Sequence, residues 1–268
     1  VREAFLRTAL RPGEEQTEEP HAILLPRISP IGDVDEDELL LSSGGSSGTG
    51  ETGFGSEVED MPPPISGLRR QMILSRLIMK WGDTLATQRI AVAPRSADQA
   101  ARLAGELGRL IDRVETEQLS FANLTDLVPS EFADHWQLTL DFLRIVTEAW
   151  PDILESEGAF DPATHRNRLI ELQATRWREQ EPQGLIVAAG STGSIPATAK
   201  LLQLISQLPN GLIVLPGLDQ TMTAEIAQAV GADPTHPQYG MVRLLERMSV
   251  ALGSVPDLTL PLPDDLER

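Results

Sequence analysis

The stretch from Gly184 to Thr223 constrains the fold of this chain more than any other. The apolar run 185–189 is too short for a free-standing helix and has the length of a buried strand. A glycine-rich turn at 190–194 follows, and after it a helix whose apolar residues recur at the spacing of one buried face. Asn210-Gly211 suits the turn that ends this helix, and a second apolar run covers 212–215. Strand, helix and strand with short connections predict a βαβ unit, and therefore a parallel sheet in an α/β fold.

Length and composition allow a large folded core. The chain has 268 residues, of which 41% are apolar, so it is long enough for one large or two ordinary domains. It has no cysteine, which excludes disulfides and thiolate metal sites and fits a reducing, cytoplasmic location. No apolar run has the length of a membrane span and no signal peptide is visible, so we expect no membrane partner. Because the first residue is Val1, we expect a fragment of a longer protein.

The net charge of −18 restricts the nucleic-acid roles open to the chain. A surface this acidic repels phosphate backbones. DNA binding would therefore need a local basic patch or a larger assembly. A helix predicted over 66–81 offers such a patch. Its cations admit two interpretations, phosphate contacts or a solvated helix face, and the second is the default. These cations are Arg69, Arg70, Arg76 and Lys80.

Shifts in composition divide the chain into segments. The acidic run Asp33–Glu38 lacks the alternating ligands and central glycine of a calcium loop, so a solvated loop or helix start is favoured over a cation site. In the helical part we expect one helix to stop at Pro151, and His165 to be a lone exposed histidine. The expected segments are an α/β piece at 1–41 with a short strand at 22–25, a flexible Gly/Ser/Pro-rich linker at 42–64, a helix and return to the core at 65–95, a helical insertion at 96–182, the βαβ core unit at 183–250 and a Pro-rich acidic tail at 251–268.

The glycine-rich turn is the one candidate for small-molecule chemistry. Its residues are Gly190, Ser191, Thr192, Gly193 and Ser194, and they offer main-chain N–H groups at a helix N-terminus, where an anion could bind. However, Ser194-Ile195-Pro196 stands where a P-loop has its Lys-Ser/Thr, and the turn does not match the Gly-x-Ser-x-Gly nucleophile elbow. The histidines are too scattered for a metal site. A turn that serves packing is favoured, and anion binding stays as the alternative.

The stretch 185–223 resembles the ATPase core of superfamily 1 helicases, in which a Walker B strand and a later Gly-Asp-x-x-Gln strand end flank one helix. In those helicases the first strand ends in Asp-Glu, which hold magnesium and activate the attacking water. The matching positions here are Ala189 and Gly190. The second strand end keeps Gly217 and Gln220, whereas Leu218 occupies the Asp position. The resemblance therefore implies a helicase-like skeleton without catalytic residues.

Further segments resemble the AddB family in its alphaproteobacterial form. They are Leu25–Glu38 (LPRISPIGDVDEDE), Phe142–Trp150 (FLRIVTEAW), Ala189–Thr198 (AGSTGSIPAT) and Thr235–Met241 (THPQYGM). The resemblance implies a degenerate RecA-like, P-loop NTPase-type sheet with a large helical insertion. It also implies a role in processing DNA double-strand breaks for recombinational repair, beside an AddA-type helicase-nuclease subunit in the bacterial cytoplasm.

The same resemblance limits the cofactors. AddB proteins carry an iron–sulfur cluster in a C-terminal nuclease domain; we expect that domain to be missing here, because no cysteine is present to hold such a cluster. ATP and magnesium would belong to the partner subunit, and the Walker A region would lie upstream of Val1. We therefore expect no cofactor, no catalytic residue and little DNA binding by this chain alone. Two alternatives remain: a small-molecule or phosphate-binding α/β enzyme that uses the glycine-rich turn, and a structural interaction module unrelated to DNA.

Overall fold

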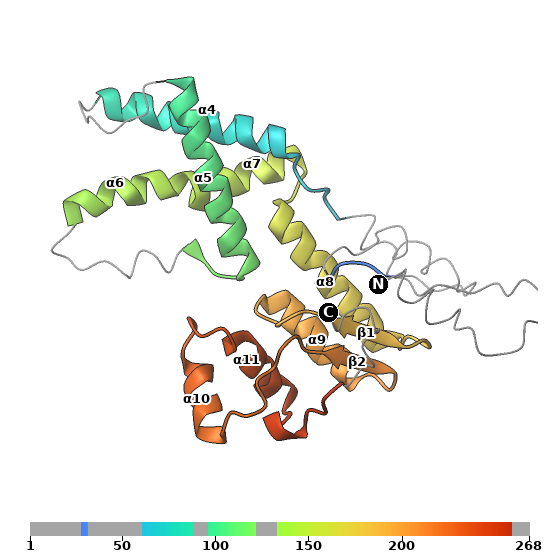
Figure 1. The fold of residues 1–268 in the computed structure, drawn as a ribbon. Coiled ribbons are helices and arrows are strands. Elements are labelled where there is room, and N and C mark those ends of the chain that lie inside the picture. The colour runs from blue at the N-terminus through green and yellow to red at the C-terminus, as the bar shows by residue number, and fades with distance from the viewer. Residues whose placement is uncertain (1–27, 32–60, 88–95, 122–132, 259–268) are drawn as a thin grey trace, which may run out of the picture.

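A computed structural model describes residues 28–31, 61–87, 96–121 and 133–258 (Figure 1). The predicted strand at 22–25, the acidic run 33–38 and most of the predicted linker lie outside these residues. The described helices are α4 (Gly67–Thr87), α5 (Ala97–Thr116), α6 (Ala133–Arg144), the π-helical turn η3 (Ile145–Ala149), α7 (Trp150–Glu157), α8 (Pro162–Glu179), α9 (Pro196–Gln207), α10 (Ala224–Ala232), α11 (Tyr239–Met248) and the short 3-10 turn η4 (Leu252–Ser254). The described strands are β1 (Ile186–Ala189) and β2 (Gly211–Val214).

The predicted βαβ unit is confirmed. β1 and β2 pair in parallel, with Ile186 opposite Gly211 and Ala189 opposite Val214, and α9 forms the crossover between them. Gly211 is needed where β2 begins, because a Cβ there would lie 1.8 Å from the carbonyl oxygen of Ile205 in α9. The described part of the chain is thus mostly helical with a small parallel sheet, which confirms the α/β class in this coarse form.

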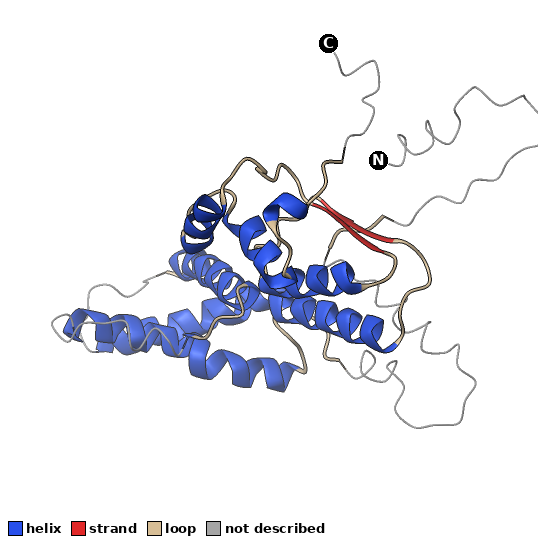
Figure 2. Ribbon diagram, turned by 90° about the horizontal axis from the view of Figure 1, so that it is seen from below, coloured by secondary structure: helices blue, strands red, loops and turns tan. Residues whose placement is uncertain are grey.

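The sheet is covered on one face. Ala188 is buried against α9, whereas Leu185, Val187 and Leu212 are 71%, 50% and 47% exposed. Because paired residues of parallel strands point to the same side, Val187 and Leu212 lie together on the outer face. Figure 2 shows the strands at one border of the helical body, with helices on one side of them only.

The buried side chains form two clusters. The first joins α4, α5, η3 and α7, with Leu74, Ile78 and Trp150 among its fully enclosed members. The second joins α9, α11, β1 and the C-terminal half of α8, around Leu202 and Leu244. In Figure 1, α8 runs from the first group of helices to the sheet. The helix α8, predicted as part of the insertion, therefore also belongs to the core of the βαβ unit.

The expectation that a helix stops at Pro151 is wrong. The helical course continues to Glu157, and Pro151 stands in the first turn of α7. The reason is η3, a π-helical turn in which the N–H of Trp150 donates to the carbonyl of Ile145, five residues back. Pro is tolerated directly after this register change because the first turn of a helix does not use its N–H groups.

Candidate functional site

The carboxyl ends of β1 and β2 lie side by side. Ala189 is paired with Val214, and the N–H of Gly190 donates to the carbonyl of Val214 over 3.1 Å. The residues that follow β2, Gly217 to Gln220, therefore begin next to the Ala189-Gly190 end of β1. In open parallel sheets this edge is where ligands bind. The parallel pairing predicted from the sequence thus brings these two strand ends together.

The positions that the resemblance assigns to catalytic carboxylates carry no ionisable group. Ala189 and Gly190 are exposed, and Gly190 has a φ of +80° with nothing within 4 Å of where a Cβ would stand. Leu218 is half-buried. Among the described residues, no group of three His, Cys, Asp or Glu side chains is placed to hold a metal ion. The described residues at this edge of the sheet therefore supply no cluster of ligands for metal-assisted hydrolysis.

The carboxylate in the loop that follows β2, Asp219, is engaged within its own loop. Its Oδ1 accepts the Oγ1–H of Thr221 over 2.6 Å and the N–H of Thr221 over 2.9 Å. These hydrogen bonds, the side-chain one foremost, hold the pKa of Asp219 below its ordinary value of 3.8. Asp219 is therefore a charged turn-former rather than a free base.

Two residues that the sequence analysis did not single out fix the loop after β2. Gln238 donates from Nε2 to the carbonyl of Gly217 over 2.9 Å, and its Oε1 accepts the N–H of Asp219 over 3.3 Å. Gln220 donates from Nε2 to Oδ1 of Asp257 over 2.9 Å. Gln238 lies in Thr235–Met241, a segment that the sequence analysis quoted as a whole, whereas Asp257 carried no signal in the sequence.

The Gly190–Ser194 turn is packed beneath α11. Gly193 has a φ of +65°, and a Cβ there would lie 2.8 Å from Cδ2 of Leu244. The N–H of Gly193 donates to Oγ of Ser191 over 3.2 Å, and Oγ1–H of Thr192 donates to Oγ of Ser194 over 3.3 Å. The turn thus satisfies part of its hydrogen bonding internally, and this geometry supports its packing role over an anion cradle.

The predicted cations of α4 occupy two different environments. Arg69 donates from Nε and Nη2 to both oxygens of Glu157, over 3.0 and 2.6 Å. This pairing raises the pKa of Arg69 and lowers that of Glu157. Arg70 is only 8% exposed and forms ion pairs with Asp112 and Asp161, each over 2.8 Å. Neither guanidinium is free to meet a phosphate without breaking an ion pair.

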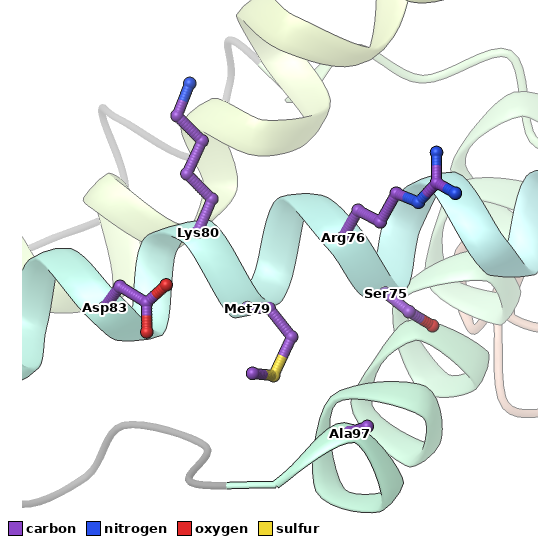
Figure 3. Close-up of a pocket in the computed structure, with 6 residues that line it drawn as sticks. All are labelled: Ser75, Arg76, Met79, Lys80, Asp83 and Ala97. Carbon is purple, nitrogen blue, oxygen red and sulfur yellow. The ribbon is translucent and has the colours of Figure 1, made fainter.

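The other two cations line a shallow groove. Arg76 and Lys80 are exposed, and neither has an ion pair with a described residue. The groove has a volume of about 340 Å³ and runs along α4 beside the start of α5. In Figure 3, Ser75 and Met79 point towards Ala97, whereas the Arg76 and Lys80 side chains project to the opposite side of α4. One carboxylate, that of Asp83, also lines the groove.

His165 is not the exposed candidate that we expected. It is 6% exposed, because this face of α8 lies against the C-terminal end of α5. On the same helix, Thr164 donates to Oε2 of Glu115 over 2.9 Å, and Asn167 donates from Nδ2 to the Glu115 carbonyl over 2.8 Å. His165 is therefore part of a helix contact.

No protein-family model, curated protein or solved structure matches this chain. None of the described helices combines the length and the apolarity that a membrane crossing requires.

Proposed function

We propose that this chain is the helicase-like, non-catalytic scaffold of an AddB-type subunit. It acts in the processing of DNA double-strand-break ends for recombinational repair, together with an AddA-type helicase-nuclease. The observation that supports this proposal is the edge formed by the ends of β1 and β2. There, two parallel strands linked by one helix present Ala189, Gly190 and Leu218 where an active helicase has carboxylates.

The chemistry of phosphoryl transfer explains why such a chain is a scaffold. Hydrolysis of ATP needs a carboxylate that holds magnesium and a group that orients the attacking water. Ala189 and Gly190 supply neither, and the carboxylate of Asp219 is held by Thr221. ATP hydrolysis and magnesium therefore belong to the partner subunit. Because the chain carries a net charge of −18, it meets DNA within the complex rather than alone.

The test begins with the full-length parent protein, purified with its partners from its own cells. Recovery of a helicase-nuclease subunit is the expected result, and the reconstituted complex should hydrolyse ATP in the presence of DNA ends. Ala189→Ser should leave that rate unchanged, since Ala189 is exposed and has no part in the chemistry. Substitution of the Walker B carboxylates in the partner should abolish it.

Two results would overturn the proposal. One is that the parent protein copurifies with no helicase-nuclease. The other is that the purified parent protein, without any partner, hydrolyses ATP. If instead inorganic phosphate bound to the isolated chain and Ser191→Ala removed the binding, the enzyme hypothesis at the Gly190–Ser194 turn would replace this one.

A further inference from the structure

The outer edge of β1 presents main-chain groups that no described strand pairs. Among the described residues the sheet consists of β1 and β2, so β1 has β2 on one side and an open edge on the other. The N–H of Ile186 donates to the carbonyl of Asn210, at the start of β2, over 2.9 Å. Because the main-chain groups of successive residues point to opposite sides of a strand, those of Val187 and Ala189 point to the open edge. An edge of this kind is a template for a further strand.

β1 is also the more open of the two strands. Leu185, just before it, is 71% exposed, Val187 is 50% exposed, and Ala189 is exposed as well. In β2, by contrast, Leu212 is exposed and the other three residues are half-buried. A two-stranded sheet is marginal by itself, and parallel sheets in α/β proteins are normally enclosed. The edge of β1 is therefore the place where the sheet is incomplete.

The chain itself carries a segment that fits this edge. Residues 22–25 (AILL), which lie outside the described residues, form an apolar run of four, the same length as β1 and as β2. Strands of parallel sheets are apolar at successive positions because both of their faces are buried, and this run has that composition. Pro26 follows directly and, since it has no N–H to donate, it suits a position just after the paired residues.

The described residues 28–31 restrict where this segment can lie. Three chain steps separate Leu25 from Ile28, and they span at most about 11 Å. In Figure 1, residues 28–31 are drawn in blue at the end of the molecule that holds α8, β1 and β2. The other apolar run of the N-terminal part, 39–41, is shorter and begins eight steps after Ile31, so its position is far less restricted.

We propose that residues 22–25 add to the open edge of β1 as a third strand. Their main chain pairs with the N–H and C=O groups of Val187 and Ala189, and their side chains extend the apolar surface on both faces of the sheet. β1 then becomes the central strand, with β2 on its other side. The inference does not depend on the proposed function, because it concerns pairing within this chain alone.

Cysteine crosslinking of the full chain tests the pairing, and the absence of natural cysteines makes each introduced pair unambiguous. Ile23→Cys combined with Val187→Cys should be joined by a short bismaleimide, because side chains on paired strands lie about 5 Å apart. Leu40→Cys with Val187→Cys controls for the rival apolar run. Ile23→Cys with Ile226→Cys controls for position, because Ile226 lies on α10 and is 51% exposed. Both control pairs should give little crosslinked product in the peptide map.

Hydrogen exchange gives a second readout. The amides of Val187 and Ala189 should exchange at least about tenfold faster in the variant Ile23→Pro with Leu24→Pro than in the wild type, because the prolines remove the added strand. Leu40→Pro is the matched control and should leave both rates unchanged. The amide of Ile186 is the internal control, since its bond to Asn210 does not involve the added strand.

Three results would overturn the inference. The first is equal exchange of Val187 and Ala189 in the wild type and in the double proline variant. The second is a crosslink from Val187→Cys to Leu40→Cys in place of Ile23→Cys. The third is a crosslink that joins labelled to unlabelled chains when the two are mixed, because the added strand would then come from a second copy. None of these results bears on the proposed function, which is decided by copurification and ATP hydrolysis.

Discussion

At the scale of single residues, Arg70 shows how neighbouring cations acquire different roles. Its guanidinium lies 2.8 Å from Asp161, and Asp161 also accepts the indole N–H of Trp150 over 2.8 Å. The contact between Nη2 of Arg70 and Oδ1 of Asp161 is an ion pair without hydrogen-bond geometry. Burial raises the pKa of Asp161 above 3.8 even though the positive charge of Arg70 opposes this shift. The network joins α4, α7 and the start of α8.

Removal of one partner from this network should lower the stability of the folded chain. Asp161→Ala should lower the free energy of unfolding by about 3–5 kcal/mol, because it leaves the charge of Arg70 buried without that partner. Urea denaturation measures the loss. The control is Asp98→Ala, which removes an exposed ion pair with Arg102 and should cost about 1 kcal/mol or less. Equal losses for the two variants would mean that the Arg70 network does not hold these helices together.

At the scale of elements, the first turn of α11 rests on the turn that links β1 to α9. A Cβ at Gly240 would lie 3.2 Å from the carbonyl oxygen of Thr192, and Leu244 lies directly over Gly193. The left-handed conformations of Gly190 and Gly193 reverse the chain between strand and helix. Gly193 must be small as well as left-handed, whereas only the second condition applies to Gly190.

Substitutions of these glycines separate the two conditions. Gly190→Ala should lower the free energy of unfolding by about 1–2 kcal/mol, which is the strain of a left-handed alanine. No steric clash adds to this loss, because the new Cβ would meet nothing within 4 Å. Gly193→Ala should cost a further 1–3 kcal/mol or so, because its Cβ would press against Leu244. Thermal and urea unfolding of both variants give the difference. Identical stabilities would show that α11 does not pack on this turn.

At the scale of the whole molecule, α8 links two clusters of buried side chains. Its first turns are hydrogen-bonded to the end of α5, and Ile170 and Ala174 lie in the cluster around α9. Gln118, just after α5, adds a direct link, because its Oε1 accepts the Nζ–H of Lys200 in α9 over 2.9 Å. We therefore expect the helical part and the βαβ unit to lose structure together.

A cavity made in one cluster of buried side chains should also destabilise the other cluster. Leu74 is 1% exposed in the first cluster, and Leu74→Ala should lower the free energy of unfolding by about 2–5 kcal/mol. Hydrogen exchange of the full chain should then become faster in α9 as well as in α4, since α8 transmits the loss. Leu202→Ala, in the second cluster, is the reciprocal variant and should speed exchange in α4. Faster exchange confined to the substituted cluster would contradict this coupling.

The sequence determined the local elements of this protein. The short apolar runs at 185–189 and 212–215, each followed by turn residues, predicted β1 and β2, and helical periodicity predicted α9, because side-chain spacing along an element reports which of its faces is buried. The βαβ order also predicted a parallel sheet, and the two strands do pair in parallel, since a crossover helix brings the second strand back in the same direction.

Only the tertiary structure decided which side chains meet. Arg69 and Arg76 look alike in the sequence, yet one is paired with Glu157, 88 residues away, and the other is exposed beside a groove. Gln238 and Asp257 reach the loop after β2 through packing of α11 and the segment that follows it. Charge pairing and burial depend on which elements are brought together, and periodicity within one element carries no information about its neighbours.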